Sequence, residues 1–468
     1  MALGPRRGVV ALALIAAFMV FVDGTIVNIT LDQLALHLHA SRSQLEWAVN
    51  AYTLSFAAVM LGAGAITDTL GGKRAFLAGL LGFTTASAVC ATAGSMLVLD
   101  VARLFQGGGA ALLLPSALVL ATASAGDERS RHRAIGWWAA AGGLGMASGP
   151  LLGGGLVAVA DWRAVFLVNV VIGVPALVWS ARSMPAVPAR PRQLDLAGMV
   201  SASALIGGLV FTLVEAPEHG WLAPDTALAT ILAVAGLVGF VLAERATPEP
   251  LLPTSVYAER RFVAAAVQGM LFNFAFYGLL FSLSLLLQQG RGLSAPETGL
   301  LFLPLTALIP VGNLCAASLA HRFGGVAVLG IGQTILALAF AAIAWSSTDD
   351  VLWPLVVALV PAGFSSGLLV PTMTAQSVAA VDTTSHGAAS AAFNTARQVG
   401  GAVGVATFGP VLGTTDLRHG FVLCLVLATG ATALALLLTG WSRDRGLRRR
   451  PPDPVSADRS QAGCSTSR

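Results

Sequence analysis

The stretch GVVALALIAAFMVFVDGTIVNIT, residues 8–30, is long and apolar enough to cross a lipid bilayer. A membrane-spanning helix needs about 20 such residues. The run nevertheless carries a carboxylate, Asp23, with the polar side chains of Thr25 and Asn28 close behind it. A charge inside a bilayer is unfavourable, so an acid at this depth indicates a functional residue with a partner elsewhere in the chain.

The whole chain has the composition of a membrane protein. It has 468 residues, of which 56% are hydrophobic and 11% are charged, whereas a soluble protein has about 25% charged residues. So few charges cannot cover a globule of this size with a hydrated surface. The sequence therefore predicts an all-α polytopic membrane protein.

Fourteen apolar runs are long enough to be transmembrane helices. They cover residues 8–30, 45–67, 74–93, 95–120, 134–158, 163–183, 196–215, 222–243, 262–288, 297–320, 325–346, 352–379, 394–415 and 420–441. We expect two pseudo-symmetric six-helix bundles with two inserted helices between them (6+2+6). The expected parts are an N-terminal bundle (1–183), linkers with the inserted pair (184–261), a C-terminal bundle (262–441) and a disordered, basic cytoplasmic tail (442–468).

Two short motifs recur in the same order in the two blocks. TDTLGG (67–72) ends the second span and AHRFGG (320–325) ends the tenth. GMASGPLLGG (145–154) in the fifth span is echoed by VATFGPVLGT (405–414) in the thirteenth. The offsets are nearly equal, which indicates a duplicated six-helix unit, an architecture typical of secondary transporters.

The distribution of basic residues orients the chain. With a cytoplasmic N-terminus and fourteen spans, 21 arginines and lysines fall on inner segments and four on outer loops. This asymmetry follows the positive-inside rule and predicts that both termini are cytoplasmic. Of the 27 basic residues only Lys73 is a lysine, which suggests a GC-rich bacterial genome and hence a bacterial cytoplasmic membrane.

Several other classes of protein lack support in the sequence. The four cysteines form neither a metal-binding spacing nor a disulfide framework, and no phosphate-binding loop of an ATPase is present. The basic residues are spread over loops, which does not indicate nucleic acid. No His, Cys or carboxylate cluster converges at one depth. We therefore expect no metal, no cofactor and no enzymatic activity.

A polar string closes the second span: Gly64, Asp68, Gly71, Lys73 and Arg74. The glycines permit a tight turn and close helix approach. Asp68 is placed to pair with Lys73 or Arg74 in a latch that breaks when the two bundles move. The alternative is an ordinary interfacial loop of mixed charge.

Arg103 lies in the outer half of the fourth span, at a depth similar to that of Asp23. We expect the two to couple directly or through water, with Gln106 and Asn28 as possible hydrogen-bond partners. Two alternatives stay open. Asp23 and Arg103 can form a permanent structural pair, or Asp100, one turn outward, can take Arg103 and leave Asp23 to face substrate.

Other polar and aromatic residues are candidates for a substrate cavity. These are Thr25, Asn28, Gln106, Phe276, Tyr277 and Asn394. The aromatic residues can equally face lipid or neighbouring helices. Arg397 is expected near the cytoplasmic end of the thirteenth span, where either snorkelling to the interface or a gating role accounts for it.

The fifth span is rich in small residues that allow close packing against a neighbouring helix, and its proline frees a backbone carbonyl. They include Gly145, Gly149, Pro150, Gly153 and Gly154. Ordinary helix packing is the alternative to a specific role.

Together these motifs resemble a known family. The string from Gly64 to Arg74 resembles the loop signature of the major facilitator superfamily, RLFQGGGAALLLP (103–115) its fourth-helix arginine motif, and GMASGPLLGGG (145–155) the fifth-helix motif of its antiporters. DGTIVNI (23–29), DWRAVFLVN (161–169) and FNTARQVGGAVGVATFG (393–409) add to the match. With fourteen spans, nearly the whole chain is similar to the fourteen-helix drug:proton antiporters. It departs from them at ITLDQL (29–34), where a proline is usual, and at His321, where an aspartate is expected.

The resemblance implies a function. Its fourth-helix arginine is associated with proton coupling and its fifth-helix motif with sealing leak paths. We expect proton-coupled efflux of small hydrophobic compounds by alternating access, with an antibiotic or several drugs as cargo, conferring resistance. The partners are then the substrate, protons and the bilayer, and we expect a functional monomer. The alternatives are a nutrient facilitator or importer, and a membrane sensor without transport.

Overall fold

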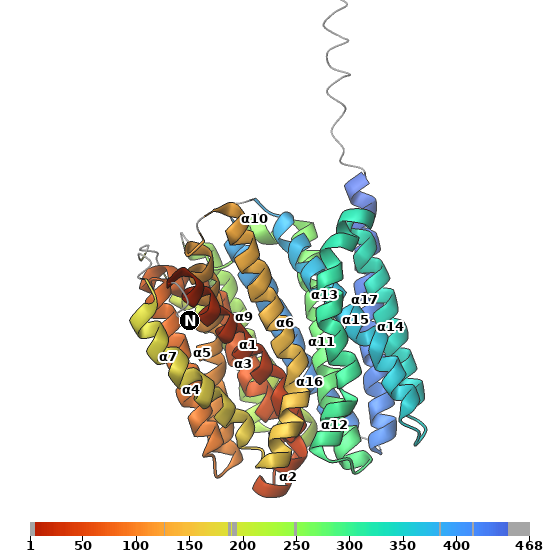
Figure 1. Ribbon diagram of the computed structural model, residues 1–468. Coiled ribbons are helices and arrows are strands. Elements are labelled where there is room, and N and C mark those ends of the chain that lie inside the picture. The colour runs from red at the N-terminus through yellow and green to blue at the C-terminus, as the bar shows by residue number, and fades with distance from the viewer. Residues whose placement is uncertain are drawn as a thin grey trace, which may run out of the picture.

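The fold is described from a computed structural model, which describes residues 5–125, 127–185, 189, 194–247, 250–382, 385–413 and 416–447. Within these ranges the regular elements are all helices, arranged as a bundle of long rods (Figure 1). The all-helical membrane fold predicted from composition is confirmed. The expected disordered tail (442–468) is corrected in its first part, because residues 442–447 belong to the last helix, which ends at Leu447. The remainder of the tail lies outside the described residues, as do residues 186–188 and 190–193 of the expected linker region.

The N-terminal bundle comprises the elements before the inserted pair. They are α1 (Pro5–Ile26), η1 (Val27–Thr30), α2 (Leu31–Leu38), α3 (Arg42–Leu70), α4 (Gly72–Ala91), α5 (Met96–Ala123), α6 (Glu128–Val159) and α7 (Ala164–Ser183). The inserted pair is α8 (Leu196–His219) and α9 (Pro224–Ala246).

The C-terminal bundle follows a short helix, α10 (Thr254–Tyr257). It comprises α11 (Arg260–Leu285), η2 (Leu286–Gly290), α12 (Ala295–Leu301), α13 (Leu303–Phe323), α14 (Gly325–Ser346), α15 (Trp353–Ala379), α16 (His386–Gly413) and α17 (Leu417–Leu447).

The number of crossings agrees with the expectation of fourteen. Thirteen helical stretches in the described part of the chain are long and apolar enough to span a bilayer. The fourteenth rod is α16, which has 28 residues and packs against α11 and α3. Its continuous apolar stretch is shorter because its first half carries Asn394, Arg397 and Gln398.

The two glycine turns of the sequence repeat have the same backbone conformation. Gly71 ends α3 with φ 82°, and Gly324 ends α13 with φ 86°. Each glycine donates its backbone N–H to the carbonyl four residues earlier, and a new helix begins at the next residue. A positive φ is available to glycine without the penalty that a side chain brings. The equivalence supports duplication of the unit.

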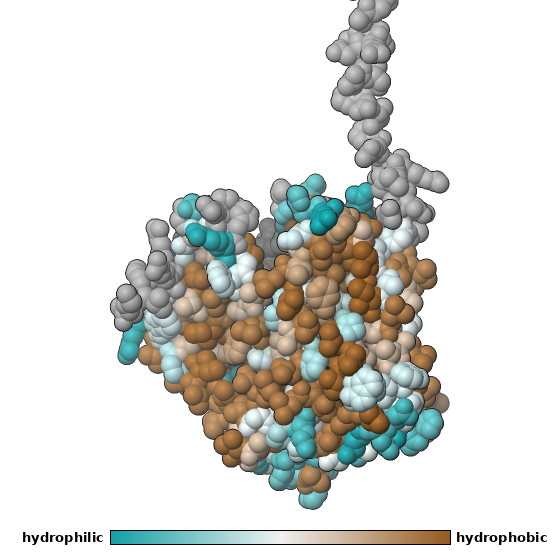
Figure 2. Space-filling view, turned by 45° about the vertical axis from the view of Figure 1, so that its right-hand side comes forward, coloured by the Kyte–Doolittle hydropathy of each residue, from teal (hydrophilic) through white to brown (hydrophobic). Residues whose placement is uncertain are grey.

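The lateral surface is suited to lipid. Figure 2 shows a broad band of apolar side chains between two more polar ends of the molecule. Large apolar residues such as Ile231, Leu314 and Leu338 are more than half exposed on this surface. Contiguous exposed apolar area on this scale indicates a membrane environment.

The bundle has two ends, the terminal face and the α2 face. The terminal face carries the start of α1 and the α3–α4 and α13–α14 turns, and the α2 face, opposite, carries α2 and the α4–α5 turn (Figure 1). The two bundles meet closely at the α2 face. Arg42 Nη1 donates to Gly409 O at 3.3 Å, Glu46 lies against the Cα of Gly409, and Ser284 Oγ donates to Asn28 O.

The terminal face differs. A methyl group added at Gly64, near the terminal end of α3, would meet no atom within 4 Å, and Asp68, one turn further on, is exposed. The described structure is therefore a state closed at the α2 face.

The contact between Glu46 and Gly409 gives a test of this closure. A Cβ at residue 409 would overlap Glu46 Oε1, so Gly409→Ala should hold α3 and α16 apart and shift the protein toward a state open at the α2 face. Distances between spin labels placed on the two bundles at this face measure the shift, and we expect longer distances than in the native chain. Gly413→Ala is the matched control, because its nearest neighbour, Arg42 Nη1, lies at an ordinary 3.5 Å.

Candidate functional site

The carboxylate of Asp23 is fully buried and forms an ion pair with Arg103, which is 1% exposed. Two amides satisfy its other oxygen: Gln106 Nε2 donates to Asp23 Oδ1 at 2.7 Å, and Asn169 Nδ2 donates to the same atom at 2.8 Å. A buried charge is tolerated when it is paired and its remaining lone pairs accept hydrogen bonds. Both conditions are met here.

The guanidinium of Arg103 is also held on several sides. Its Nε donates to Ala48 O at 3.0 Å and its Nη1 to Gln106 Oε1 at 2.8 Å. Its Cζ lies 4.4 Å from the ring centroid of Tyr52, within the range of a cation–π contact. Gln106 donates further to Ser87 Oγ of α4 at 2.8 Å. The network thus joins α1, α3, α4, α5 and α7.

The structure distinguishes between the partners expected for Arg103. The guanidinium pairs with Asp23, and it forms no ion pair with Asp100, whose Oδ1 is buried without a hydrogen-bond partner. Asn28 is not part of the network: its Nδ2 donates to Thr25 O at 3.2 Å and its Oδ1 has no partner. The expected role of Asn28 as a partner of the pair is therefore corrected.

Asn169 is the member of the Asp23 network that sequence reasoning missed. It is the only amide in the apolar run of α7 and is 1% exposed. That isolation was the available signal, since a lone amide in a membrane helix needs a partner on another helix.

The fifth-helix glycines form the contact between α6 and α1. A Cβ at Gly145 would lie 2.6 Å from Phe18 O, one at Gly149 would overlap Thr25 Oγ1, and one at Gly153 would lie 2.9 Å from Ile26 Cγ1. Glycines four residues apart share one face of a helix.

The same part of α6 also meets the C-terminal bundle. A Cβ at Gly154 would lie 2.8 Å from Ala295 O, and one at Gly299 would lie 2.6 Å from Pro150 O. The motif therefore packs backbone against backbone both within its own bundle and at the boundary between the bundles.

Thr25 takes part in this packing. Its hydroxyl donates to Met146 O at 3.2 Å, and its side chain is 1% exposed. The structure therefore places Thr25 in a helix contact, whereas the sequence suggested a cavity. Gln106 likewise belongs to the Asp23 network.

The loop string is not latched in this state. Asp68 forms no ion pair with Lys73 or Arg74 among the described residues, and Lys73 Nζ donates to Ala181 O at 3.1 Å. The expected pairing of Asp68 with these cations is corrected for the described state. Gly71 supplies the turn that the sequence predicted.

The remaining cavity candidates lie in the C-terminal bundle. Phe276 stacks on Phe272 with ring centroids 5.7 Å apart and meets Tyr277 edge to face. A Cβ at Gly24 would lie 3.9 Å from the Tyr277 hydroxyl, so this ring reaches α1 beside Asp23. Asn394 Nδ2 donates to Ser390 O at 2.9 Å. Arg397 is buried at 8% exposure, so the snorkelling alternative is contradicted and the gating role stays a prediction.

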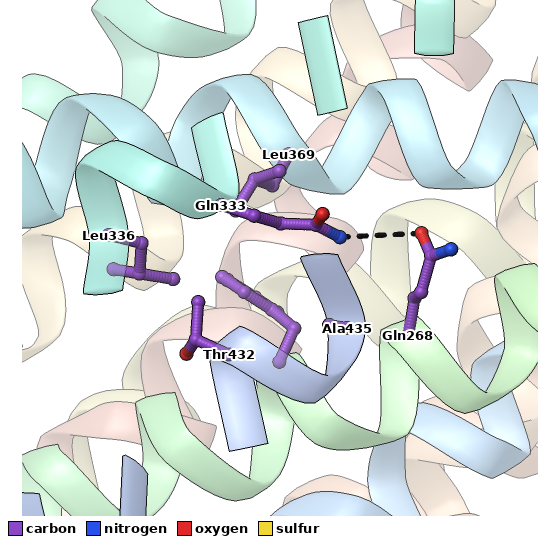
Figure 3. A pocket seen from close by; sticks show the side chains of 7 residues that line it. Gln268, Gln333, Leu336, Leu369, Thr432 and Ala435 are labelled. Carbon is purple, nitrogen blue, oxygen red and sulfur yellow. Dashed lines mark hydrogen bonds between the residues drawn. The ribbon is translucent and has the colours of Figure 1, made fainter. Parts of the chain in front are cut away.

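A neutral polar cluster lies inside the C-terminal bundle. Gln333 Nε2 donates to Gln268 Oε1 at 3.4 Å (Figure 3), and Thr439 Oγ1 donates to Gln333 Oε1 at 2.8 Å. The first two side chains border a small cavity with Phe272, Leu336, Leu369, Thr432 and Ala435. It contains no ionisable group, and its contacts tie α11, α14 and α17 together.

Two six-helix bundles of repeated topology, with a buried ion pair in one of them, define a secondary membrane transporter. Residues 13–405 match the sequence profile of the Major Facilitator Superfamily. The chain belongs to this superfamily.

Similar proteins agree with this assignment. The chain is 36% identical to the methylenomycin A resistance protein of Bacillus subtilis, over 90% of this chain and 91% of the relative. It is 33% identical to the methylenomycin A resistance protein of Streptomyces coelicolor, over 95% and 94%. A solved structure of a human organic anion transporter superposes with a TM-score of 0.65 at 19% identity, covering 93% of this chain and all of that one. This last likeness concerns the fold.

The close contact between the Thr25 hydroxyl and Gly149 gives a prediction. Gly149→Ala should push α1 away from α6 and lower both thermal stability and activity, because the added methyl overlaps the threonine hydroxyl. Thr25→Ala in the same chain should restore part of the loss by removing that hydroxyl. Gly155→Ala, which meets nothing within 4 Å, should behave as the native chain. If the double variant is no more stable or active than Gly149→Ala alone, the overlap with Thr25 does not account for the loss.

Asn169 gives a second prediction. Asn169→Ala removes one donor from the buried Asp23 carboxylate and should lower the free energy of unfolding by about 1–3 kcal/mol. Unfolding in detergent micelles, followed by tryptophan fluorescence, measures the change. Asp350→Asn weakens an ion pair with Arg418 in which the aspartate is 84% exposed and should change stability by roughly 0–1 kcal/mol. Equal changes in the free energy of unfolding for the two variants would contradict a stabilising role of the hydrogen bond from Asn169 to Asp23.

Proposed function

We propose that this chain is a proton-coupled exporter of small hydrophobic compounds, with an antibiotic as its cargo, and that it confers resistance. The observation that carries the proposal is the buried pair of Asp23 and Arg103 with its amide partners. Asp23 is a titratable group inside a membrane bundle, and its charge is paired with Arg103 on another helix. Such intramembrane pairs are typical of proton pathways in transporters.

The names of the relatives support the direction and the kind of cargo. The proteins from Bacillus subtilis and Streptomyces coelicolor are both called methylenomycin A resistance proteins and match this chain almost end to end. A protein from Streptomyces glaucescens, 32% identical, is called a tetracenomycin C resistance and export protein. By analogy, this transporter moves an antibiotic out of the cell and does not act as an enzyme.

The mechanism follows from the network around Asp23. A proton on Asp23 removes the charge that holds Arg103, and the freed guanidinium then favours a different packing of α1, α5 and α7. Release of the proton restores the pair. If the protonated and the deprotonated arrangement each favour opening at a different face of the molecule, proton entry is coupled to substrate exit.

The driving force is sufficient for export. One charge crossing 100 mV is worth about 2.3 kcal/mol. At about 1.4 kcal/mol per tenfold, one proton then sustains a roughly 50-fold gradient of a neutral substrate.

In this proposal the protein lies in the cytoplasmic membrane of a bacterial cell, with both termini in the cytoplasm. It acts as a monomer. The arginine-rich segments at the terminal face support this orientation. The described state, closed at the α2 face, then corresponds to an inward-facing transporter. The string from Gly64 to Arg74 would latch the terminal face when the protein opens outward, and Asp100 would serve as an alternative partner of Arg103 in that state.

The test uses proteoliposomes with an imposed pH gradient and a panel of antibiotics added one at a time. An exported compound should dissipate the gradient with native protein, and Asp23→Asn should abolish this proton movement because it cannot bind and release a proton. Asp161→Asn, an exposed loop acid, is the control and should keep it. Equal flux of the compounds with and without a pH gradient would instead support a facilitator and contradict the proton-coupled mechanism.

A further inference from the structure

Arg397 is a buried cation without a counter-ion. It lies on α16 with 8% of its surface exposed, and no described carboxylate lies within ion-pair distance of it. Its Nε donates to Asn273 Oδ1 at 3.3 Å, and its two Nη nitrogens donate to no described residue.

The other buried arginine shows what a compensated site looks like in this molecule. Arg103 is matched by the carboxylate of Asp23 and by two protein oxygens besides, Ala48 O and Gln106 Oε1. An uncompensated buried cation is strongly unfavourable, whereas a paired one is not. In a membrane bundle, a charge kept without a protein partner is a candidate for binding a ligand of opposite charge.

The surroundings of Arg397 fix its side chain and leave its far edge free. Its Cγ lies against Gly269, where a Cβ would come within 2.9 Å, and its Cζ is 5.9 Å from the centroid of the Phe393 ring. Asn273 is held in turn by Gln398, to which its Nδ2 donates at 3.4 Å. The two free Nη groups form a planar fork, the geometry that matches both oxygens of a carboxylate.

The position is right for a transported molecule. Gly269, Asn273 and Tyr277 follow one face of α11 at intervals of four residues, and the Tyr277 hydroxyl reaches α1 beside Asp23. Asn273, which holds the guanidinium, and Tyr277 are four residues apart on α11, a rise of about 6 Å toward the proton site. A small molecule bound at Arg397 would lie close to the boundary between the two bundles, near the Tyr277 ring.

We propose that Arg397 binds the anionic group of the exported compound, and that the cargo is a small apolar molecule carrying a carboxylate. Asn273 positions the guanidinium, and Tyr277 contacts the apolar part. This inference rests on the proposed function, since it specifies the substrate class of the same exporter.

An anionic cargo changes the energetics of export. Its own charge is driven outward by a membrane potential that is negative inside, which sustains a roughly 50-fold gradient per 100 mV without any proton. Exchange against one proton moves two charges and raises the limit to roughly 2,000-fold. A bound anion also favours protonation of a nearby carboxyl such as that of Asp23. If both bound to the same state, they would be carried in the same direction. Exchange therefore requires that the anion binds to the inward-facing state and the proton to the outward-facing state.

The test measures binding with no gradient and no flux. Purified full-length protein in lipid nanodiscs is titrated with benzoate and with benzamide, which share size and ring but differ in charge, and the shift of the thermal unfolding midpoint gives an apparent Kd. We expect native protein to bind benzoate at least about tenfold more tightly than benzamide. Arg397→Gln should erase this preference, and Arg397→Lys should keep part of it because a point charge remains without the fork. Arg163→Gln, an exposed arginine, should leave it unchanged.

The outcomes separate this inference from the proposed function. Equal binding of benzoate and benzamide by native protein, or an unchanged preference in a folded Arg397→Gln, would overturn the carboxylate site. Displacement of benzoate by chloride at similar concentration would assign the site to an inorganic ion and also overturn it. Asp23→Asn should keep the benzoate preference while losing proton movement, so loss of proton coupling alone leaves this inference standing.

Discussion

The ion pair between Asp23 and Arg103 constrains the N-terminal bundle more than any other interaction. Two charges removed from water are stable only when each is matched in detail, and the matching groups here come from five helices. Asn169 of α7 and Ser87 of α4 hold the network from outside the pair itself. The relative positions of these helices therefore follow from one electrostatic requirement. Protonation of a single carboxyl removes that requirement, and this is why the site suits a coupled transporter.

The boundary between the two bundles is built differently. None of the ion pairs among the described residues crosses it. The contacts there are glycine backbones against neighbouring chains, as at Gly154 and Gly299, and a few hydrogen bonds such as that from Arg42 to Gly409 O. Such surfaces pack closely yet separate without exposing a broken charge pair. The rigid network thus lies within a bundle, and the separable contacts lie between bundles.

The sequence predicts the spans, the duplication and the Asp23–Arg103 pair, because long apolar runs and rare charges within them are strong signals. It does not predict Asn169, since a lone amide does not reveal which helix it faces. Arg397 was misplaced for a geometric reason. The expected span began at residue 394 whereas α16 begins at His386, and those eight residues move the arginine about 12 Å deeper.

The closed α2 face also holds polar groups without partners. Glu46 Oε2, both side-chain polar atoms of Asn50 and Asn28 Oδ1 are buried and make no hydrogen bond. A buried group left in this way costs about 1–3 kcal/mol relative to a hydrated one, which offsets part of the gain from close glycine packing. Opening of this face would hydrate these groups as it breaks the backbone contacts. Alternating access requires two states of similar free energy, and a closed face that is well packed but incompletely hydrogen-bonded meets that requirement.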